Sequence, residues 1–131
     1  MTKHFVKLLF AATLVVSSCC TGEGGGSSVV SGKVYHHEKP IANAKVYVKY
    51  DAKDLPSTDV SVYNQSLTVG ADASYSLSGL KCGDYYIYAT GIDDALVSPE
   101  DVVTGGLYVK IGKDGSVVEK DVYVAEAAHV H

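Results

Sequence analysis

Short segments of alternating apolar and polar residues, separated by turns rich in glycine, proline and aspartate, constrain the fold most strongly. In segment 44–50 the even-numbered positions hold Ala, Val, Val and Tyr, whereas the odd-numbered positions hold Lys, Tyr and Lys. Side chains of a strand point alternately to its two faces, so such a segment is typical of a half-buried strand. No segment has a helical period over a convincing length. The pattern therefore predicts an all-β protein.

Similar alternation recurs along the chain and predicts about seven strands. The apolar positions of these segments are Val30 and Val34; Tyr75 and Leu77; Tyr85, Ile87 and Ala89; Leu107, Val109 and Ile111; and Val118, Val122 and Val124. A third strand or an irregular pair of strands is expected from Val60 and Val62 together with Leu67 and Val69, although residues 63–66 interrupt the alternation there. The Asp114–Gly115 pair predicts a hairpin turn. Together these signals indicate a seven-stranded antiparallel β-sandwich of the immunoglobulin-like class.

Segment 79–91 is expected to form the corner that sets the register of the sheet. Gly79 and Gly83 can adopt positive φ without a Cβ clash, so they can turn the chain back tightly. Tyr85 then begins a strand, with its ring inward and its hydroxyl within reach of a loop carbonyl. Cys82 is interpreted as a small, partly buried corner residue, with an intermolecular disulfide as the alternative. Its only intramolecular partner within the exported chain would be Cys20.

The N-terminal segment is typical of a lipoprotein signal peptide, predicted over residues 1–18. Lys3 and Lys7 supply a positive start, and residues 8–16 form an apolar stretch that is too short to span a bilayer. Residues 16–19, Val-Ser-Ser-Cys, resemble a bacterial lipobox, which makes Cys19 the predicted acyl acceptor and Cys20 the alternative. Residues 21–28 contain no large apolar side chain and are interpreted as a flexible tether. The folded domain is therefore predicted over residues 29–131.

The charge of the chain argues against a nucleic-acid partner. The formal net charge is −4, and all eleven basic residues are lysines. Removal of residues 1–18 leaves nine lysines against fifteen carboxylates, a net charge of −6. Nucleic-acid binding requires the opposite sign, and the bidentate recognition of phosphates and base edges usually depends on arginine.

Four motifs occur in the order and spacing of one known domain. They are Gly-Lys-Val at 32–34, Pro-Ile-Ala-Asn-Ala-Lys-Val at 40–46, Tyr-Ser-Leu at 75–77 and Gly-Leu-Lys-Cys-Gly-Asp-Tyr at 79–85. In combination they resemble the carboxypeptidase-regulatory-like domain, a prealbumin-like (transthyretin-like) β-sandwich related to Cna-B modules. The chain departs from the family at Ala73, where glycine is usual, and at Lys81 and Cys82, where proline is frequent. The resemblance implies a non-enzymatic module carried by an outer-membrane lipoprotein, in a leaflet that the sequence leaves undetermined.

Neither a catalytic site nor a metal site or cofactor is expected. Hydroxyisourate hydrolases share the transthyretin-like fold but require an arginine-containing C-terminal motif, whereas this chain ends in Ala-His-Val-His. His129 and His131 could bind Zn²⁺ or Cu²⁺ together with the His36–His37 pair, but incidental histidines are favoured. The acidic residues of segment 93–101 could bind Ca²⁺, but their spacing does not match an EF-hand and a solvated loop is favoured.

Tyrosines are the candidate binding residues. Strand alternation places Tyr35, Tyr47, Tyr86, Tyr88, Tyr108 and Tyr123 on outward faces. Tyr86 and Tyr88, together with Tyr47 and Tyr108, form the predicted binding surface, since exposed tyrosines stack on sugar rings and anchor protein contacts. A simple solvated strand face is the alternative. The predicted function is thus a membrane-anchored binder of a protein partner or glycan. The alternative is a structural accessory subunit of a nutrient-uptake or cell-surface complex, docked by strand pairing.

Overall fold

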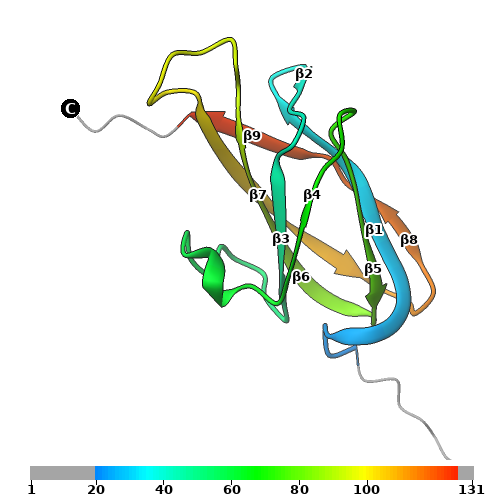
Figure 1. Cartoon of the computed structure of the whole chain (residues 1–131). Coiled ribbons are helices and arrows are strands. Elements are labelled where there is room, and N and C mark those ends of the chain that lie inside the picture. The colour runs from blue at the N-terminus through cyan, green and yellow to red at the C-terminus, as the bar shows by residue number, and fades with distance from the viewer. Residues whose placement is uncertain (1–19, 127–131) are drawn as a thin grey trace, which may run out of the picture.

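The computed structural model describes residues 20–126, which form one strongly curved sheet of nine strands (Figure 1). The strands are β1 Gly24–His36, β2 Lys39–Pro40, β3 Lys45–Tyr50, β4 Gln65–Thr68, β5 Ser74–Leu80, β6 Gly83–Ile92, β7 Val102–Ile111, β8 Val117–Glu119 and β9 Val122–Glu126. A single 3₁₀ turn, η1 Val60–Val62, interrupts this part of the chain. The predicted signal peptide, Cys19, His129 and His131 lie outside the described residues. Within residues 20–126 no helix has the length and apolar character needed to cross a membrane.

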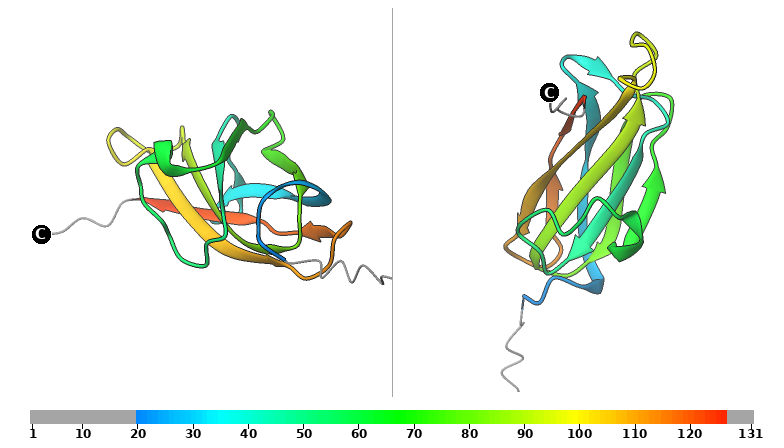
Figure 2. Two further views of the ribbon diagram at one scale, coloured as in Figure 1. Left: turned by 90° about the horizontal axis from the view of Figure 1, so that it is seen from below. Right: turned by 90° about the vertical axis from the view of Figure 1, so that its left-hand side faces the viewer.

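The sheet curls until its two ends face each other as two layers (Figure 2). Strands follow the order β2-β1-β9-β7-β6-β3-β4, and β5 and β8 pair with β1 outside this path. One layer is built on β3, β4, β6 and β7, and the other on β1, β5 and β8. Strand β9 pairs with both β1 and β7 and so joins the layers. The all-β prediction is therefore confirmed, as one half-barrel sheet.

The predicted seven antiparallel strands differ from the observed topology in number and direction. The sheet has nine strands, and β1 runs parallel to both β8 and β9. The turn at 112–115 does not form the predicted hairpin, because the strands on its two sides do not pair with each other. Strand β7 pairs with β6 and β9, whereas β8 pairs with β1. The Asp-Gly turn therefore carries the chain from one layer to the other and does not close a two-strand hairpin.

The glycine-rich segment that was predicted to be a tether is largely strand. Residues 24–28 belong to β1, which begins five residues before the predicted domain boundary. A Cβ atom at Gly26 would lie 2.2 Å from the backbone oxygen of Leu80, so this close strand approach requires glycine. Cys20 is bonded to Cys82, which corrects the expectation of an unbridged corner cysteine. Both errors arise because the glycine run was interpreted from its lack of apolar side chains alone.

The strand expected from Leu67 and Val69 together with Val60 and Val62 was wrong in its first part, at Val60 and Val62. Both residues lie in η1 and are exposed, and Asp59 caps this turn by accepting a hydrogen bond from the backbone N–H of Ser61. The chain re-enters the sheet only at β4, where Leu67 packs against the core.

The core lies between the layers and contains the inward positions of the predicted strands. Its fully buried side chains include Val30, Val34, Val46, Val48, Leu77, Leu80, Tyr85, Ile87, Val103, Val109 and Ile111. At the corner, Gly79 and Gly83 have φ values of 72° and 144°, as predicted. The Tyr85 hydroxyl donates to the backbone oxygens of Lys81 and Glu23, at 2.5 and 3.0 Å. The corner prediction is confirmed.

Candidate functional site

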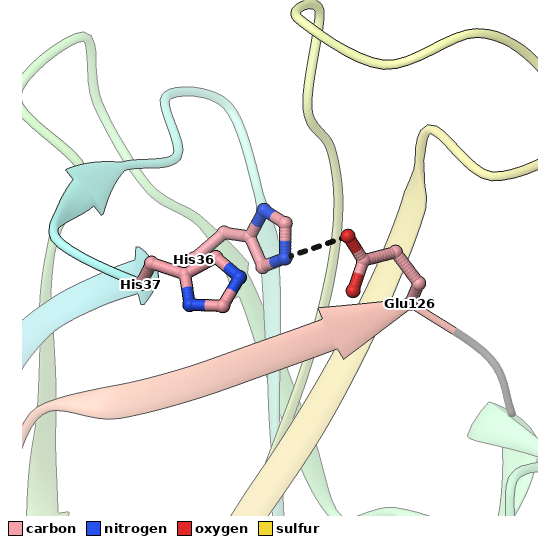
Figure 3. Close-up of side chains that lie close together, drawn as sticks. All are labelled: His36, His37 and Glu126. Carbon is pink, nitrogen blue, oxygen red and sulfur yellow. Dashed lines mark ion pairs between the residues drawn. The ribbon is translucent and has the colours of Figure 1, made fainter.

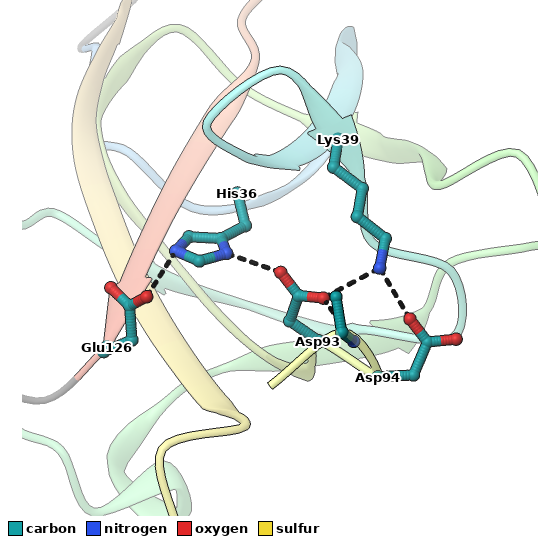
Figure 4. Close-up of polar contacts among 6 residues, drawn as sticks. His36, Lys39, Asp93, Asp94 and Glu126 are labelled. Carbon is teal, nitrogen blue, oxygen red and sulfur yellow. Dashed lines mark hydrogen bonds and ion pairs between the residues drawn. The ribbon is translucent and has the colours of Figure 1, made fainter. Parts of the chain in front are cut away.

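A polar cluster with two buried members, called the buried cluster below, occupies the end of the molecule where β1 and β9 finish (Figure 4). His36 is the last residue of β1 and is 4% exposed, as is Asp93 in the loop after β6. His36 Nδ1 lies 2.6 Å from Asp93 Oδ2, and Lys39 Nζ lies 2.8 Å from Asp93 Oδ1. Asp94 also pairs with Lys39. On the other side of the imidazole ring, Glu126 Oε1 lies 3.2 Å from His36 Nε2. These five side chains come from three stretches of the chain, at residues 36–39, 93–94 and 126.

Charge balance explains why two titratable groups are buried here. The hydrogen bond to Asp93 raises the pKa of His36 above its ordinary value, although burial opposes this. Lys39 and then His36 hold the pKa of Asp93 far below its usual range, assisted by the backbone N–H of Ala95. Asp93 is therefore ionised, and its two oxygens accept hydrogen bonds from both cationic neighbours.

This pairing bears on the acidic segment 93–101, which was considered as a Ca²⁺ loop. Both oxygens of Asp93 are engaged by His36 and Lys39, so it is not a free oxygen ligand. Among the described residues, the group of His, Cys, Asp and Glu side chains that could share one ion consists of His36, His37 and Glu126. That group contains no residue of segment 93–101.

Two tyrosine surfaces flank the sheet, and the first contains the four predicted binding residues. Tyr47 and Tyr88 are direct neighbours on β3 and β6, with ring centroids 6.3 Å apart. Tyr63, which the sequence did not single out, stacks on Tyr88 at 5.8 Å and tilts against Tyr47 at 5.7 Å. Tyr88 is only 6% exposed as a result. Burial among these rings raises the pKa of Tyr63 to about 12.

Tyr86 and Tyr108 extend this first surface along β6 and β7. They are direct partners across the two strands, and the Tyr108 hydroxyl donates to Asp84. A Cβ at Gly106 would lie 2.7 Å from the Tyr86 ring, so the ring occupies the space beside that glycine. The fold brings the four predicted tyrosines to one face, but Tyr47 and Tyr88 pack against each other and against Tyr63.

The second surface is a tyrosine pair where β1 and β9 run in parallel, which we call the Tyr35–Tyr123 platform. The two rings are stacked, with centroids 5.9 Å apart and an interplanar angle of 24°. Tyr123 is 65% exposed. Two adjoining grooves share Tyr35 and Asp121. The larger, about 560 Å³, is lined also by Lys33, Ser74, Tyr75 and Glu119, and the smaller, about 240 Å³, by His37, Glu38 and Tyr123.

The buried cluster and the chain entry lie at opposite ends of the sheet (Figure 1). Cys20 is bonded to Cys82 just before β6, at the end where β1 begins. The Lys81 N–H donates to the Glu23 oxygen, and the Gly22 N–H donates to the Cys82 oxygen. The start of the described chain is thus fixed to the corner by one covalent bond and two backbone hydrogen bonds.

Comparison with known proteins finds similarity to solved structures. No family model and no curated protein matches the chain. A crystal structure of PA1324, a proposed carbohydrate-binding protein from Pseudomonas aeruginosa, matches at a TM-score of 0.50 and 13% identity, over 78% of this chain and 91% of that one. A DUF3823 family protein from Parabacteroides merdae matches at a TM-score of 0.46 and 15% identity, over 78% of this chain and 47% of that one. At these identities the first likeness shows a common β-rich fold alone.

Proposed function

We propose that the protein is a non-enzymatic, carbohydrate-binding surface module and that the Tyr35–Tyr123 platform is its sugar site. The observation that carries this proposal is an exposed, stacked tyrosine pair at the edge of two grooves that also contain carboxylates. Sugars bind through the stacking of C–H faces on aromatic rings and through hydrogen bonds from hydroxyls to carboxylates. Glu38, Glu119 and Asp121 supply such acceptors around the platform.

The platform is preferred to the predicted surface at Tyr86 and Tyr88 because Tyr123 is exposed to solvent whereas Tyr88 is not. Tyr88 is almost completely covered by Tyr47 and Tyr63, so its face is not available to a ligand. The groove beside Tyr47 and Tyr63 has a volume of about 120 Å³, much less than the 560 Å³ groove beside Tyr35. The Pseudomonas protein with the same fold is itself a proposed carbohydrate-binding protein, which is consistent with this function. Membership of the carboxypeptidase-regulatory-like family is part of the same proposal.

A glycan array followed by calorimetry with the strongest hit tests the sugar site. We expect Tyr123→Ala and Tyr35→Ala to weaken binding at least tenfold, because each removes one ring of the platform. Tyr108→Ala, on the other surface, is the matched control and should change affinity less than twofold. Loss of binding in Tyr86→Ala or Tyr88→Ala with no effect of Tyr123→Ala would move the site to the first surface and contradict the platform.

The rival function is that of an accessory subunit that docks by strand pairing. Within residues 20–126, β4 and β5 each have a single hydrogen-bonded neighbour strand, so each offers an open edge. Pull-down from native membranes separates the two functions. A stoichiometric membrane partner, together with no hit on the glycan array, would favour the subunit and contradict the sugar-binding module.

We also propose that the protein is anchored to the bacterial outer membrane through acylated Cys19. The Cys20–Cys82 bond supports Cys19 over Cys20, because a lipidated cysteine carries diacylglycerol on its sulfur and cannot also form a disulfide. A stable disulfide is consistent with export to an oxidising compartment. With the anchor next to Cys20, the buried cluster at the opposite end of the sheet would point away from the bilayer.

Membrane fractionation tests the anchor. We expect Cys19→Ala to release the protein into the soluble fraction and to remove the acyl mass, since acyl chains contribute about 0.8 kcal/mol per buried CH₂. Unchanged membrane retention in this variant would contradict the assignment of Cys19.

A further inference from the structure

We propose that His36, His37 and Glu126 form a binding site for a divalent transition-metal ion, with Zn²⁺ as the best match (Figure 3). One potential ligand atom from each side chain lies within 4.8 Å of the other two. Imidazole nitrogen and carboxylate oxygen are typical Zn²⁺ ligands. This inference does not depend on sugar binding, because it rests on a different set of side chains.

The backbone at the end of β1 brings two consecutive histidines together. In a continuing strand the side chains of His36 and His37 would point to opposite faces. His37 has a φ of 56°, in the left-handed region that non-glycine residues rarely adopt, and the strand ends there. The two rings consequently lie 4.5 Å apart, centroid to centroid. Unusual backbone conformations of this kind are concentrated at functional sites.

Asp93 holds His36 in the orientation that a metal ligand requires. Asp93 Oδ2 lies 2.6 Å from His36 Nδ1, and the other oxygen of the same carboxylate is held by Lys39, so Nδ1 is the ring nitrogen that Asp93 positions. The nitrogen left to face Glu126 is Nε2, and the binding of an ion there would release its proton. That nitrogen is buried, and in the described part of the chain it has the Glu126 carboxylate as an ion-pair partner but no hydrogen bond of good geometry. A carboxylate behind a ligating imidazole is the usual arrangement at zinc sites.

The spacing of the first two ligand atoms already suits Zn²⁺. His36 Nε2 and Glu126 Oε1 are 3.2 Å apart. Tetrahedral bonds of about 2.0–2.1 Å place neighbouring ligand atoms about 3.3 Å from each other. His37 and Glu126 are exposed, so His37 can close the remaining distance by side-chain rotation and the ion can enter from solvent. Three protein ligands leave a fourth position open. Since His37 also lines the smaller groove, this position lies next to the proposed sugar site.

Calorimetric titration with ZnSO₄ tests the site in the mature chain carrying His129→Ala and His131→Ala. These two changes remove the other histidines of the mature chain, which could bind Zn²⁺ independently. We expect one Zn²⁺ per chain, and at least tenfold weaker binding in His37→Ala and in Glu126→Gln. Glu38→Gln is the matched control, because Glu38 is an exposed neighbour outside the ligand group, and its affinity should change less than twofold.

Co²⁺ substitution provides a second measurement that does not depend on stability. Four-coordinate Co²⁺ gives visible d–d absorption, which His37→Ala should abolish while circular dichroism shows the protein still folded. Absence of saturable Zn²⁺ binding in the His129→Ala/His131→Ala chain would overturn the site. Binding unchanged by both His37→Ala and Glu126→Gln, or equally tight binding of Ca²⁺, would also overturn it.

Discussion

Tyr85 connects three parts of the molecule through one side chain. Its ring is fully buried and meets Tyr50 edge to face, with centroids 5.9 Å apart. Its hydroxyl reaches the carbonyl of Lys81 in the corner and that of Glu23 in the N-terminal segment. Ring packing and hydroxyl hydrogen bonding therefore act at the same residue, and substitutions can separate their contributions to the free energy of unfolding.

We expect Tyr85→Ala to reduce the free energy of unfolding by about 3–5 kcal/mol, the range for deleting a large buried aromatic ring. Tyr85→Phe removes only the hydroxyl and should cost about 0.5–1.5 kcal/mol. Urea denaturation measures both, and Tyr123→Ala, an exposed tyrosine, should stay within about 0.5 kcal/mol. A loss of less than about 0.5 kcal/mol in Tyr85→Ala would place Tyr85 outside the core.

Buried tyrosines also predict a loss of stability in alkali. Burial raises the pKa of Tyr85 to about 12 and raises that of Tyr75 further still. In the unfolded chain a tyrosine titrates near pH 10. Because the folded-state pKa lies above the unfolded value, the neutral buried phenol makes its full contribution to stability below pH 10. This contribution is lost as the pH rises through 10 towards 12.

Unfolding free energies measured between pH 9 and pH 12 test this expectation. Stability should fall across this interval, and it should fall less steeply in a Tyr75→Phe/Tyr85→Phe variant, which has lost both phenols. An equal slope in the wild type and the variant would show that other groups cause the alkaline loss.

At the scale of the strand, alternation predicted the elements well and long-range pairing poorly. The inward positions of β3, β5 and β6 follow directly from period 2, because one face of each strand meets the core. The parallel pairing of β1 with β8 and β9 could not be predicted, since it depends on contacts between distant segments. The all-β class was therefore predictable, whereas the mixed half-barrel topology was not.

The candidate site shows the same division. Continuing the alternation of Val30, Gly32 and Val34 by one step places His36 inward, so its burial had a signal in the sequence that was not used. Its partners Asp93 and Glu126 lie 57 and 90 positions away, and local pattern does not specify such pairs. Likewise, Tyr63 covers Tyr88 from an irregular segment whose path no period determines.

Gly32 offers a test of how β1 packs against its neighbours. A Cβ at this position would lie 1.9 Å from the backbone oxygen of Lys120. We expect Gly32→Ala to cost at least about 1–3 kcal/mol, the range for overpacking, because backbone atoms must move apart. Gly112→Ala is the matched control, as nothing lies within 4 Å of its Cβ position. Urea denaturation should show no loss in the control, and equal effects in the two variants would contradict the close approach of β1 to residue 120.

At the scale of the whole molecule, the Cys20–Cys82 disulfide determines how the domain is attached to what precedes it. The bond joins residues 62 positions apart and fixes the N-terminal segment to the corner. An anchor at Cys19 would therefore hold the domain directly at the bilayer surface, without the flexible tether that the glycine run suggested. The proposed sugar platform and the proposed metal ligands both include residues at the end of β1 farthest from this attachment (Figure 1).

The disulfide should also contribute strongly to stability, and its removal gives the corresponding prediction. Closing a loop of this length in the unfolded chain corresponds to about 4 kcal/mol in the chain-entropy model. We expect Cys20→Ala/Cys82→Ala to lower the unfolding free energy by up to this amount but to remain folded, because the Gly22 and Lys81 backbone hydrogen bonds persist. Urea denaturation of this variant, and of the wild type with and without reductant, measures the loss.

The reductant provides the control for this prediction. If reductant shifts the wild-type midpoint but leaves the midpoint of the variant unchanged, the effect belongs to this bond. An unshifted wild type would show that the bond adds no stability, and the close attachment of the domain would then depend on the backbone contacts alone.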